Sequence, residues 1–232
     1  MVSTQGAGPL RWPLLFIDTI MKTYIYIDGF NFYYGAIKGT AHKWLNLMKV
    51  FENILDPKHD IISIKYFTAK VSGKLDPGQP IRQKTYIRAL EKYIPEIDVH
   101  YGAFLSHNVF MPLAYPIDEK LFRKKIKFAQ VMKTEEKGSD VNLALHLLND
   151  AWLNRYECAV VVSNDSDLAE ALKLVKTQHK KMIGLVTPNK THPSKELMKY
   201  ADFNKRVRKG VLAKSQLPNP IPGTTIHKPT AW

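Results

Sequence analysis

The sequence predicts an α/β fold with a mostly parallel central sheet and helices on both faces. Strand-like and helix-like segments alternate along the chain, and the crossover helices that parallel strands require are supplied by the segments between them. The run 158–163 (CAVVVS) is almost continuously apolar, as is typical of a parallel strand covered on both faces. Apolar residues make up 45% and charged residues 24% of the 232 residues, the composition of an ordinary globular domain.

Each expected element follows from its residue pattern. Short runs rich in β-branched and aromatic residues predict strands over 23–28, 61–69, 98–104, 125–132, 158–163 and 183–187. Apolar residues at helical spacing predict helices over 44–55, 79–93, 141–154 and 167–178. Residues 105–125 show neither period, so we expect a hairpin or loop excursion there.

The chain length indicates one domain with extensions at both ends. Residues 1–21 have no period, and we expect them to be an N-terminal extension, disordered or not native, with Met21 as a candidate start. The domain itself is expected over 22–205. Residues 206–232 are expected to form the end of a basic helix followed by an extended tail. The prolines at 218, 220, 222 and 229 exclude a helix in the tail. The tail is expected to pack either on its own domain or on a second subunit. In the second case the protein would be a homodimer.

The chain is strongly basic, with a net charge of +13 and a pI near 9.6, which favours a polyanionic partner. Residues 173–214 contain twelve Lys or Arg against only Glu196 and Asp202. A second basic cluster precedes Asp140 and consists of Lys120, Arg123, Lys124, Lys125, Lys127 and Lys133. We expect these side chains to hold a nucleic acid backbone, the alternative being a basic face that is merely solvated.

Several classes of protein are excluded or disfavoured. Cys158 is the single cysteine, so the chain has no intrachain disulfide, and a thiolate zinc site is excluded. No run approaches the roughly 20 apolar residues of a membrane span, and the N-terminus does not have the pattern of a secretory signal. We therefore expect a cytoplasmic protein without a membrane partner.

Carboxylates follow the strands at three expected strand-to-helix junctions. Asp28 ends the first strand, Asp140 precedes the 141–154 helix, and Asp165 and Asp167 follow the 158–163 strand. In an open α/β sheet the working site lies outside the carboxyl ends of the strands, so we expect these four side chains to converge.

A cluster of carboxylates predicts a bound cation, because like charges in one cleft repel one another. All-oxygen ligands suit one or two Mg²⁺ or Mn²⁺ ions. Such ions activate water for the hydrolysis of phosphodiester bonds. The alternative is that each Asp only caps a helix; Asp140 and Asp165 are good cap candidates, and Asp28, which is followed by Gly29, is a weaker one.

Three motifs in order, YIDGFN, EKGSDVNLAL and VVVSNDSDL, resemble the NYN-domain family, its LabA-like branch in particular, within the PIN-like nucleases. The resemblance covers about residues 22–205 and implies a Rossmann-like PIN/NYN domain. It also implies a metal-dependent ribonuclease acting on single-stranded or structured RNA, with acidic positions at Asp28, Asp140, Asp165 and Asp167. The implied neighbouring contacts are Asn31 and Ser163, with Lys137 at a phosphate.

The family commonly has a further acidic residue between its first and third motifs, and this sequence does not place it. Glu135 and Glu136 lie near Asp140, but in a polar run that is typical of a solvated face.

Aromatic residues directly after Asp28 could stack on bases of a single strand. Phe30, Phe32, Tyr33 and Tyr34 are the candidates, and we expect half or more of them to be ordinary core.

Two other functions compete with the nuclease. A nucleotide-handling enzyme of Rossmann type is disfavoured, because the chain has neither G-x-G-x-x-G nor G-x-x-x-x-G-K-[ST]. A non-catalytic RNA-binding or regulatory module with the same fold remains the alternative.

Overall fold

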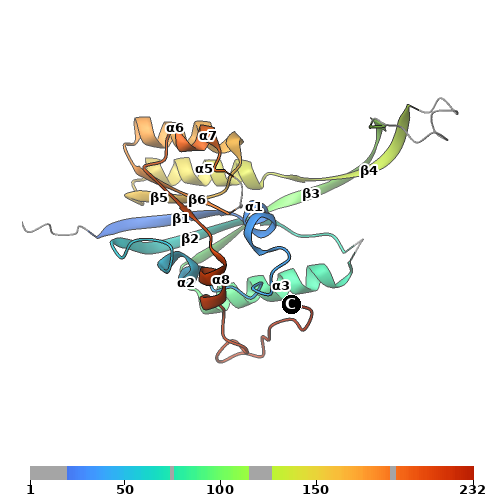
Figure 1. Ribbon diagram of the computed structural model, residues 1–232, viewed down its shortest axis with the longest axis horizontal. Helices are drawn as coiled ribbons and strands as arrows, with labels where there is room; N and C mark the ends of the chain where they lie inside the picture. The colour runs from blue at the N-terminus through green and yellow to red at the C-terminus, as the bar shows by residue number, and fades with distance from the viewer. Residues whose placement is uncertain (1–19, 74–75, 115–126, 189–191) are drawn as a thin grey trace, which may run out of the picture.

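The computed structural model describes residues 20–73, 76–114, 127–188 and 192–232 (Figure 1). The predicted N-terminal extension lies outside the described residues up to residue 19, whereas Met21 already belongs to the first strand. Lys124 and Lys125, with most of the basic cluster before Asp140, also lie outside them.

A seven-stranded sheet forms the centre of the molecule, in the order β4-β3-β2-β1-β5-β6-β7. Every neighbouring pair is parallel except β3 and β4, which confirms the predicted mostly parallel sheet. β1 pairs with β2 on one side and with β5 on the other, so the strand order reverses between β1 and β5. The strands are β1 Met21–Asp28, β2 His59–Ala69, β3 Ile97–Pro112, β4 Phe128–Lys137, β5 Cys158–Val162, β6 Met182–Thr187 and β7 Phe203–Arg206.

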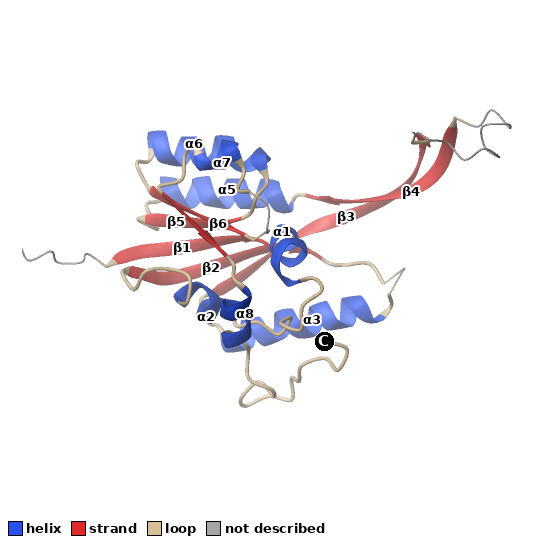
Figure 2. Ribbon diagram, in the orientation of Figure 1, coloured by secondary structure: helices blue, strands red, loops and turns tan. Residues whose placement is uncertain are grey.

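Helices cover both faces of this sheet, as predicted (Figure 2). One face carries α5, α6 and α7, and the other carries α2, α3 and α8. Along β1, Ile25 and Ile27 belong to the core under α2 and α3, while Tyr26 belongs to the core under α5 and α6. The helical elements are α1 Gly29–Phe32, the π-helical η1 Tyr33–Ile37, α2 Leu47–Glu52, α3 Gly78–Tyr93, α5 Ser139–Trp152, the 3₁₀ turn η2 Ser166–Leu168, α6 Ala169–Gln178, α7 Lys195–Met198 and α8 Lys209–Lys214.

β3 and β4 continue beyond the sheet as a long antiparallel ribbon that projects from the body (Figure 1). This confirms a hairpin as the excursion expected after residue 104. The strand predicted over 125–132 is instead Phe128–Lys137 and takes in Glu135 and Glu136. The ribbon exposes large apolar side chains, among them Phe110 and Phe128.

The sequence missed β7. This strand has only four residues and lies between charged side chains, in the stretch where a basic helix was expected; the helix, α8, begins only at Lys209.

The C-terminal tail packs on its own domain. Leu217, Ile221 and Ile226 are buried in the core under α2 and α3, and the Trp44 indole nitrogen donates a hydrogen bond of 3.0 Å to the Pro218 carbonyl. The ring of Trp232 lies 5.7 Å from that of Tyr86. Of the two places expected for the tail, its own domain and a second subunit, the structure shows the first.

A buried ion pair joins the sheet to α5. The Lys65 ammonium lies 2.5 Å from a carboxylate oxygen of Asp150, whose side chain is fully buried. The hydroxyl of Tyr26 donates to the same oxygen over 2.8 Å, and Arg155 contacts the other oxygen over 3.0 Å. The charge of Asp150 is therefore compensated inside the protein.

Within the described part of the chain, none of the helices has both the length and the apolar character that crossing a membrane would require.

Candidate active site

Asp28 ends β1 at the point where the strand order reverses, and its side chain is only 4% exposed. One carboxylate oxygen accepts a hydrogen bond of 2.9 Å from the backbone amide of Asn31, so Asp28 caps α1. The other oxygen accepts from the Ser163 hydroxyl over 2.9 Å. Asp28 was expected to be the weakest candidate for a helix cap, but it does cap α1, and it also contacts Ser163 after the neighbouring strand β5. Burial raises the pKa of Asp28, against the opposing effect of these hydrogen bonds.

Gly29 allows β2 to approach Asp28 closely. A Cβ atom at residue 29 would lie 2.6 Å from the Phe67 carbonyl oxygen and 2.9 Å from the ring of Tyr66. The glycine after the first carboxylate is therefore required by packing.

The loop after β5 is tied to the end of β1 by hydrogen bonds. The Ser163 hydroxyl accepts from the Asp165 amide over 3.0 Å, and Asp165 in turn accepts from the Asp167 amide over 3.0 Å. Asp165 therefore caps η2, as predicted. The backbone amide of Asn164 donates to the side-chain oxygen of Asn31 over 3.2 Å.

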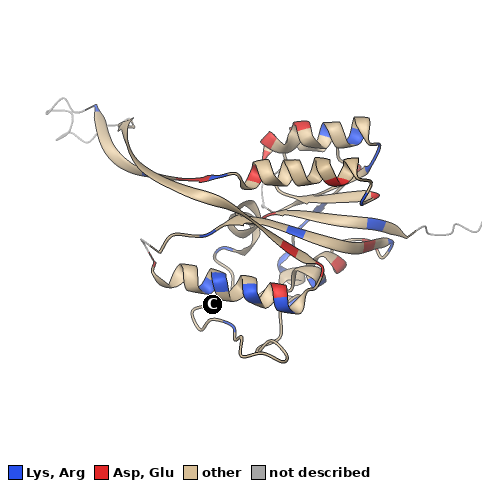
Figure 3. Cartoon of the chain, turned by 180° about the vertical axis from the view of Figure 1, so that it is seen from behind, with Lys and Arg blue, Asp and Glu red and all other residues tan. Residues whose placement is uncertain are grey.

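Asp140 does not cap α5, contrary to the cap interpretation. Gly138 occupies the position before the helix with a φ of 96°, and a carboxylate oxygen of Glu136 accepts from the Ser139 amide over 3.0 Å. Asp140 lies in the first turn, and Figure 3 shows acidic residues where the ribbon enters this helix. Its carboxylate is consequently free of the capping role.

Electrostatics show that the predicted carboxylates come together. Burial raises the pKa of Asp140 to about 6, and repulsion from four other carboxylates adds to the shift. In order of decreasing effect, those four are Asp28, Asp165, Glu136 and Asp167. The three other predicted Asp residues, together with Glu136, which was expected on a solvated face, are therefore near enough to Asp140 to repel its charge.

The predicted basic contacts are less close to this cluster. Lys137 lies on β4, with its ammonium 3.2 Å from a carboxylate oxygen of Glu135. Glu135 also pairs with Lys133, so it belongs to the surface of the ribbon, as expected. Lys124 and Lys125 lie outside the described residues.

Comparison with known families gives one decisive match: the NYN domain matches residues 22–205, most of the chain and all of the carboxylate motifs. The chain belongs to the NYN domain family. The PIN-like, nuclease-type character expected from the motifs is thereby confirmed at the level of the family, and the LabA-like branch stays a prediction.

A curated relative of this NYN domain is the 6-hydroxy-3-succinoylpyridine 3-monooxygenase HspA of Pseudomonas putida. The two are 35% identical over 236 residues, which cover 91% of this chain and 75% of the relative. A solved structure, a protein of unknown function from Vibrio parahaemolyticus, matches with a TM-score of 0.49 and 18% identity, over 83% of this chain and 96% of that one.

The donor chemistry of the NYN site fits a hard divalent ion. Carboxylate oxygens of Asp28, Asp140, Asp165 and Asp167 are the ligand type that Mg²⁺ and Mn²⁺ prefer, and their mutual repulsion leaves a charge for a cation to compensate. Among residues 20–73, 76–114, 127–188 and 192–232, however, no three His, Cys, Asp or Glu side chains are placed so that they could hold one metal ion together. Mg²⁺ usually keeps several of its waters and binds through only one or two carboxylates, so it does not require three protein ligands.

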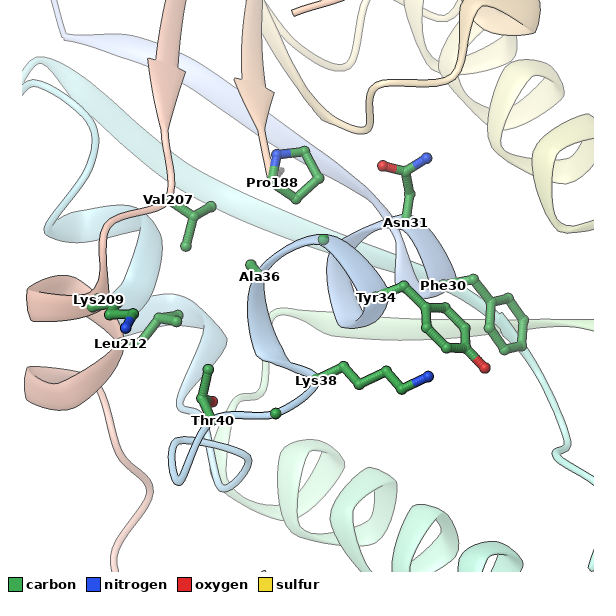
Figure 4. A pocket seen from close by; sticks show the side chains of 12 residues that line it. Phe30, Asn31, Tyr34, Ala36, Lys38, Thr40, Pro188, Val207, Lys209 and Leu212 are labelled. Carbon is green, nitrogen blue, oxygen red and sulfur yellow. The ribbon is translucent and has the colours of Figure 1, made fainter. Parts of the chain in front are cut away.

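Two cavities flank α1 and η1 beside this site. The first, of about 730 Å³, is lined by Asn31, Lys38 and Lys209 among others (Figure 4). The second, of about 500 Å³, begins at Gly29 and extends to α3 and the tail. Phe30 and Tyr34 line both cavities.

The aromatic residues after Asp28 divide between core and surface. Phe32 is buried, Phe30 and Tyr33 are half-buried, and Tyr34 is 57% exposed. Tyr34 therefore remains a candidate for stacking, and Phe32 does not.

Two residues of the site were missed from the sequence, and a third was assigned to the wrong environment. Glu136 was noted near Asp140 but was expected on a solvated face, because the run around it is polar. Asn164 directly follows the predicted contact Ser163, but nothing in the sequence indicates that it bridges to Asn31. Tyr66 lies on β2, with no local signal that its ring reaches Gly29.

Proposed function

We propose that this NYN domain is a metal-dependent ribonuclease that hydrolyses RNA phosphodiester bonds, acting as an endonuclease. The observation that supports this most is the hydrogen bond of 2.9 Å from the Ser163 hydroxyl after β5 to Asp28 at the end of β1, and the repulsion that Asp28, Asp165 and Asp167 exert on Asp140 agrees with it. The ends of β1 and β5 lie at the switch point where ligands bind in open α/β sheets.

In this proposal Asp28, Asp140, Asp165 and Asp167 hold one or two Mg²⁺ or Mn²⁺ ions. Such an ion supplies charge neutralisation and an activated water when it is bound. The protein's own contribution is orientation: the hydrogen bonds from Asn31 and Ser163 fix both oxygens of Asp28, and the Ser163 hydroxyl also holds the Asp165 amide. The site is thus organised before substrate arrives.

The proposed substrate is RNA in single-stranded or structured form. Lys38 and Lys209 line the first cavity next to Asn31, and α3 carries the exposed cations Lys84, Arg88 and Lys92 (Figure 3). Lys124, Lys125 and Lys137 remain proposed contacts to the backbone. Binding through such cations weakens steeply as salt rises.

The test is cleavage of labelled RNA with Mn²⁺ or Mg²⁺ by the wild type and by Asp28→Asn and Asp167→Asn. We expect both variants to lose at least about 100-fold in rate, a loss typical of removing a charged group that stabilises the transition state. Asp60→Asn, at the opposite end of β2, is the matched control and should cleave normally. Unchanged cleavage in both site variants would remove the proposal.

A non-catalytic RNA-binding module is the outcome to conclude if the wild type binds RNA but does not cleave it with either metal. The clustered carboxylates argue against this module, because they repel a phosphate backbone unless a cation is present.

A second candidate function is a monooxygenase. It is favoured by the 35% identity to the 6-hydroxy-3-succinoylpyridine 3-monooxygenase, which extends over 91% of this chain. Such a reaction consumes O₂ and a reductant. Oxygen uptake in the presence of 6-hydroxy-3-succinoylpyridine and a reduced nicotinamide, with and without flavin, tests it directly; uptake equal to that without the pyridine would dismiss it.

We further propose a cytoplasmic location, which the single cysteine favours. The homodimer also remains a proposal, and sedimentation of the purified chain measures it.

A further inference from the structure

We propose that the second cavity, between α1–η1, α3 and the C-terminal tail, binds one nucleobase of the RNA strand whose phosphate lies at the carboxylates. This inference rests on the proposed ribonuclease function and deepens it, because a base held there would give the cut a base preference.

Seven of the residues that line the cavity are aromatic. They include the rings of Phe30, Tyr33, Tyr34, Tyr66, Tyr86 and Trp232. The volume of about 500 Å³ lies within the range of about 300–1,000 Å³ that small-molecule sites occupy. Aromatic walls bind bases of any sequence by stacking, because every base has a π face.

Several of the aromatic side chains that line the cavity contact one another or a neighbouring cation. Tyr33 and Tyr34 belong to the π-helical segment η1, a rare conformation that is frequent at functional sites. The ring of Tyr34 lies 5.3 Å from that of Tyr33, and the Lys38 ammonium lies 4.8 Å from its centroid. On the far side, Trp232 is placed by the buried tail and packs edge-on against Tyr86.

The cavity reaches the residue next to Asp28. Gly29 lines it and directly follows Asp28. The ring of Tyr66 approaches the Gly29 backbone so closely that a Cβ there would lie 2.9 Å from it. A base in the cavity would therefore belong to a strand that passes the end of β1, where Asp28 lies.

The polar groups of the cavity suit a base better than a second phosphate. At the rim, Arg82 pairs with Asp76, so its charge is compensated. Gln83 is fixed, since its amide donates to the Ala69 carbonyl over 2.9 Å and its oxygen accepts from the Val71 amide over 3.0 Å. The hydroxyl of Thr68 and the ammonium of Lys43 add hydrogen-bonding groups for the edge of a ring.

Binding is tested on the full chain with millimolar Mg²⁺, because the carboxylates repel a phosphate when no cation is present, and a mononucleotide has no internal phosphodiester bond to be cleaved. AMP, GMP, CMP and UMP are titrated into the wild type, Tyr34→Ala and Trp232→Leu by calorimetry, with 6-hydroxy-3-succinoylpyridine as a further probe. Trp152→Ala and Tyr93→Ala remove exposed rings on other surfaces and serve as controls. We expect at least one nucleotide to bind the wild type and both controls equally, and to bind Tyr34→Ala about tenfold or more weakly.

The second readout is the cut profile on an RNA that contains all four bases with Mn²⁺ present. A base preference that Tyr34→Ala flattens and Trp152→Ala retains supports the cavity. Tyr34 is largely exposed, so its loss leaves the fold intact even if Trp232→Leu loosens the tail.

Two results would overturn the inference: no nucleotide binding at millimolar concentration, or binding of the pyridine with none of a nucleotide. If RNA is cut with an unchanged profile in Tyr34→Ala, the inference fails and the ribonuclease stands. If a nucleotide binds through Tyr34 but no RNA is cut, the ribonuclease fails and the base pocket is supported.

Discussion

The hydroxyl of Ser163 donates a hydrogen bond of 2.9 Å to Asp28, and this contact joins the ends of the two strands between which the sheet order reverses. Two residues that are 135 positions apart in the chain are thereby fixed side by side. The contact stabilises the charged form of Asp28 against the effect of burial.

We therefore expect Ser163→Ala to raise the pKa of Asp28 further and to lower stability by about 1–3 kcal/mol, since a buried carboxylate loses a donor. The acid limb of the pH–rate profile for RNA cleavage should move to higher pH. Ser106→Ala, which removes an exposed hydroxyl from the ribbon, is the control. An acid limb at the wild-type pH would contradict the prediction.

Asp140 should make the metal-free protein less stable as the pH rises. Its pKa is about 6 in the folded state and near 3.8 in the unfolded chain, so between these values the folded state binds more protons. The free energy of unfolding should fall between about pH 4 and 6, by about 1 kcal/mol from this half-exposed group after screening. Chemical denaturation of wild type and Asp140→Asn measures it, and the variant should show a smaller fall; equal slopes would refute it.

Divalent ions should raise the melting temperature of the folded protein. Mg²⁺ or Mn²⁺ at millimolar concentration should raise it more at pH 7 than at pH 5, because protonation of Asp140 competes with the cation. Thermal unfolding at both pH values checks this. The reference is the protein in buffer that contains a chelator and no added divalent ion. A melting temperature that changes with neither ion at pH 7 counts against a bound metal.

Gly29→Ala should destabilise the fold by about 1–3 kcal/mol, because the new methyl group would meet the Phe67 carbonyl and the backbone must shift. Gly210→Ala is a matched control: the position lies in α8 with open space around it, so the same substitution should be neutral or stabilising by up to about 1 kcal/mol. Urea denaturation compares the two. If Gly29→Ala lowers the free energy of unfolding no more than Gly210→Ala does, β2 can move away from the new methyl group at little cost, and the prediction is wrong.

Asp150→Asn should destabilise the protein by about 3–5 kcal/mol, because it leaves the buried Lys65 ammonium without its anion. Glu170→Gln, which breaks the exposed pair with Lys173, should cost less than about 1 kcal/mol. Cleavage per folded molecule should be normal in both variants. A similar small effect for the two substitutions would mean that Lys65 finds another partner or water.

The sequence predicted the sheet where the signal is local. β5 is apolar throughout because both of its faces are covered, and α5 and α3 show clear helical spacing. β7 was missed because four residues among charges carry too short a pattern. β4 was misplaced because a ribbon that stands outside the core has no buried face to impose alternation on its sequence.

The shared edge of parallel strands predicts that Asp28 and Asp165 lie near each other, but it does not apply to Asp140, which follows the antiparallel β4, and it does not predict the local roles of these carboxylates. Glu136 caps α5 because Gly138 takes a left-handed turn and because Gly102 on β3 leaves room; a Cβ at residue 102 would lie 2.4 Å from the Glu136 carboxylate. This depends on a contact between residues 34 positions apart. No spacing rule applied to EKGSD alone could assign the cap to Glu136 and free Asp140.

Residues 22–205, which match the family, do not include the tail residues that complete the core. We therefore expect that these residues do not fold stably without the tail. If the chain were cut at the last matched residue, 205, Trp44 and Leu45 would lose the cover provided by Leu217, Ile221 and Ile226, and their uncovered rings and side chains would promote aggregation. Functional assays on a minimal fragment would then report a damaged molecule, so a negative result from one would say nothing about the activity of the full chain.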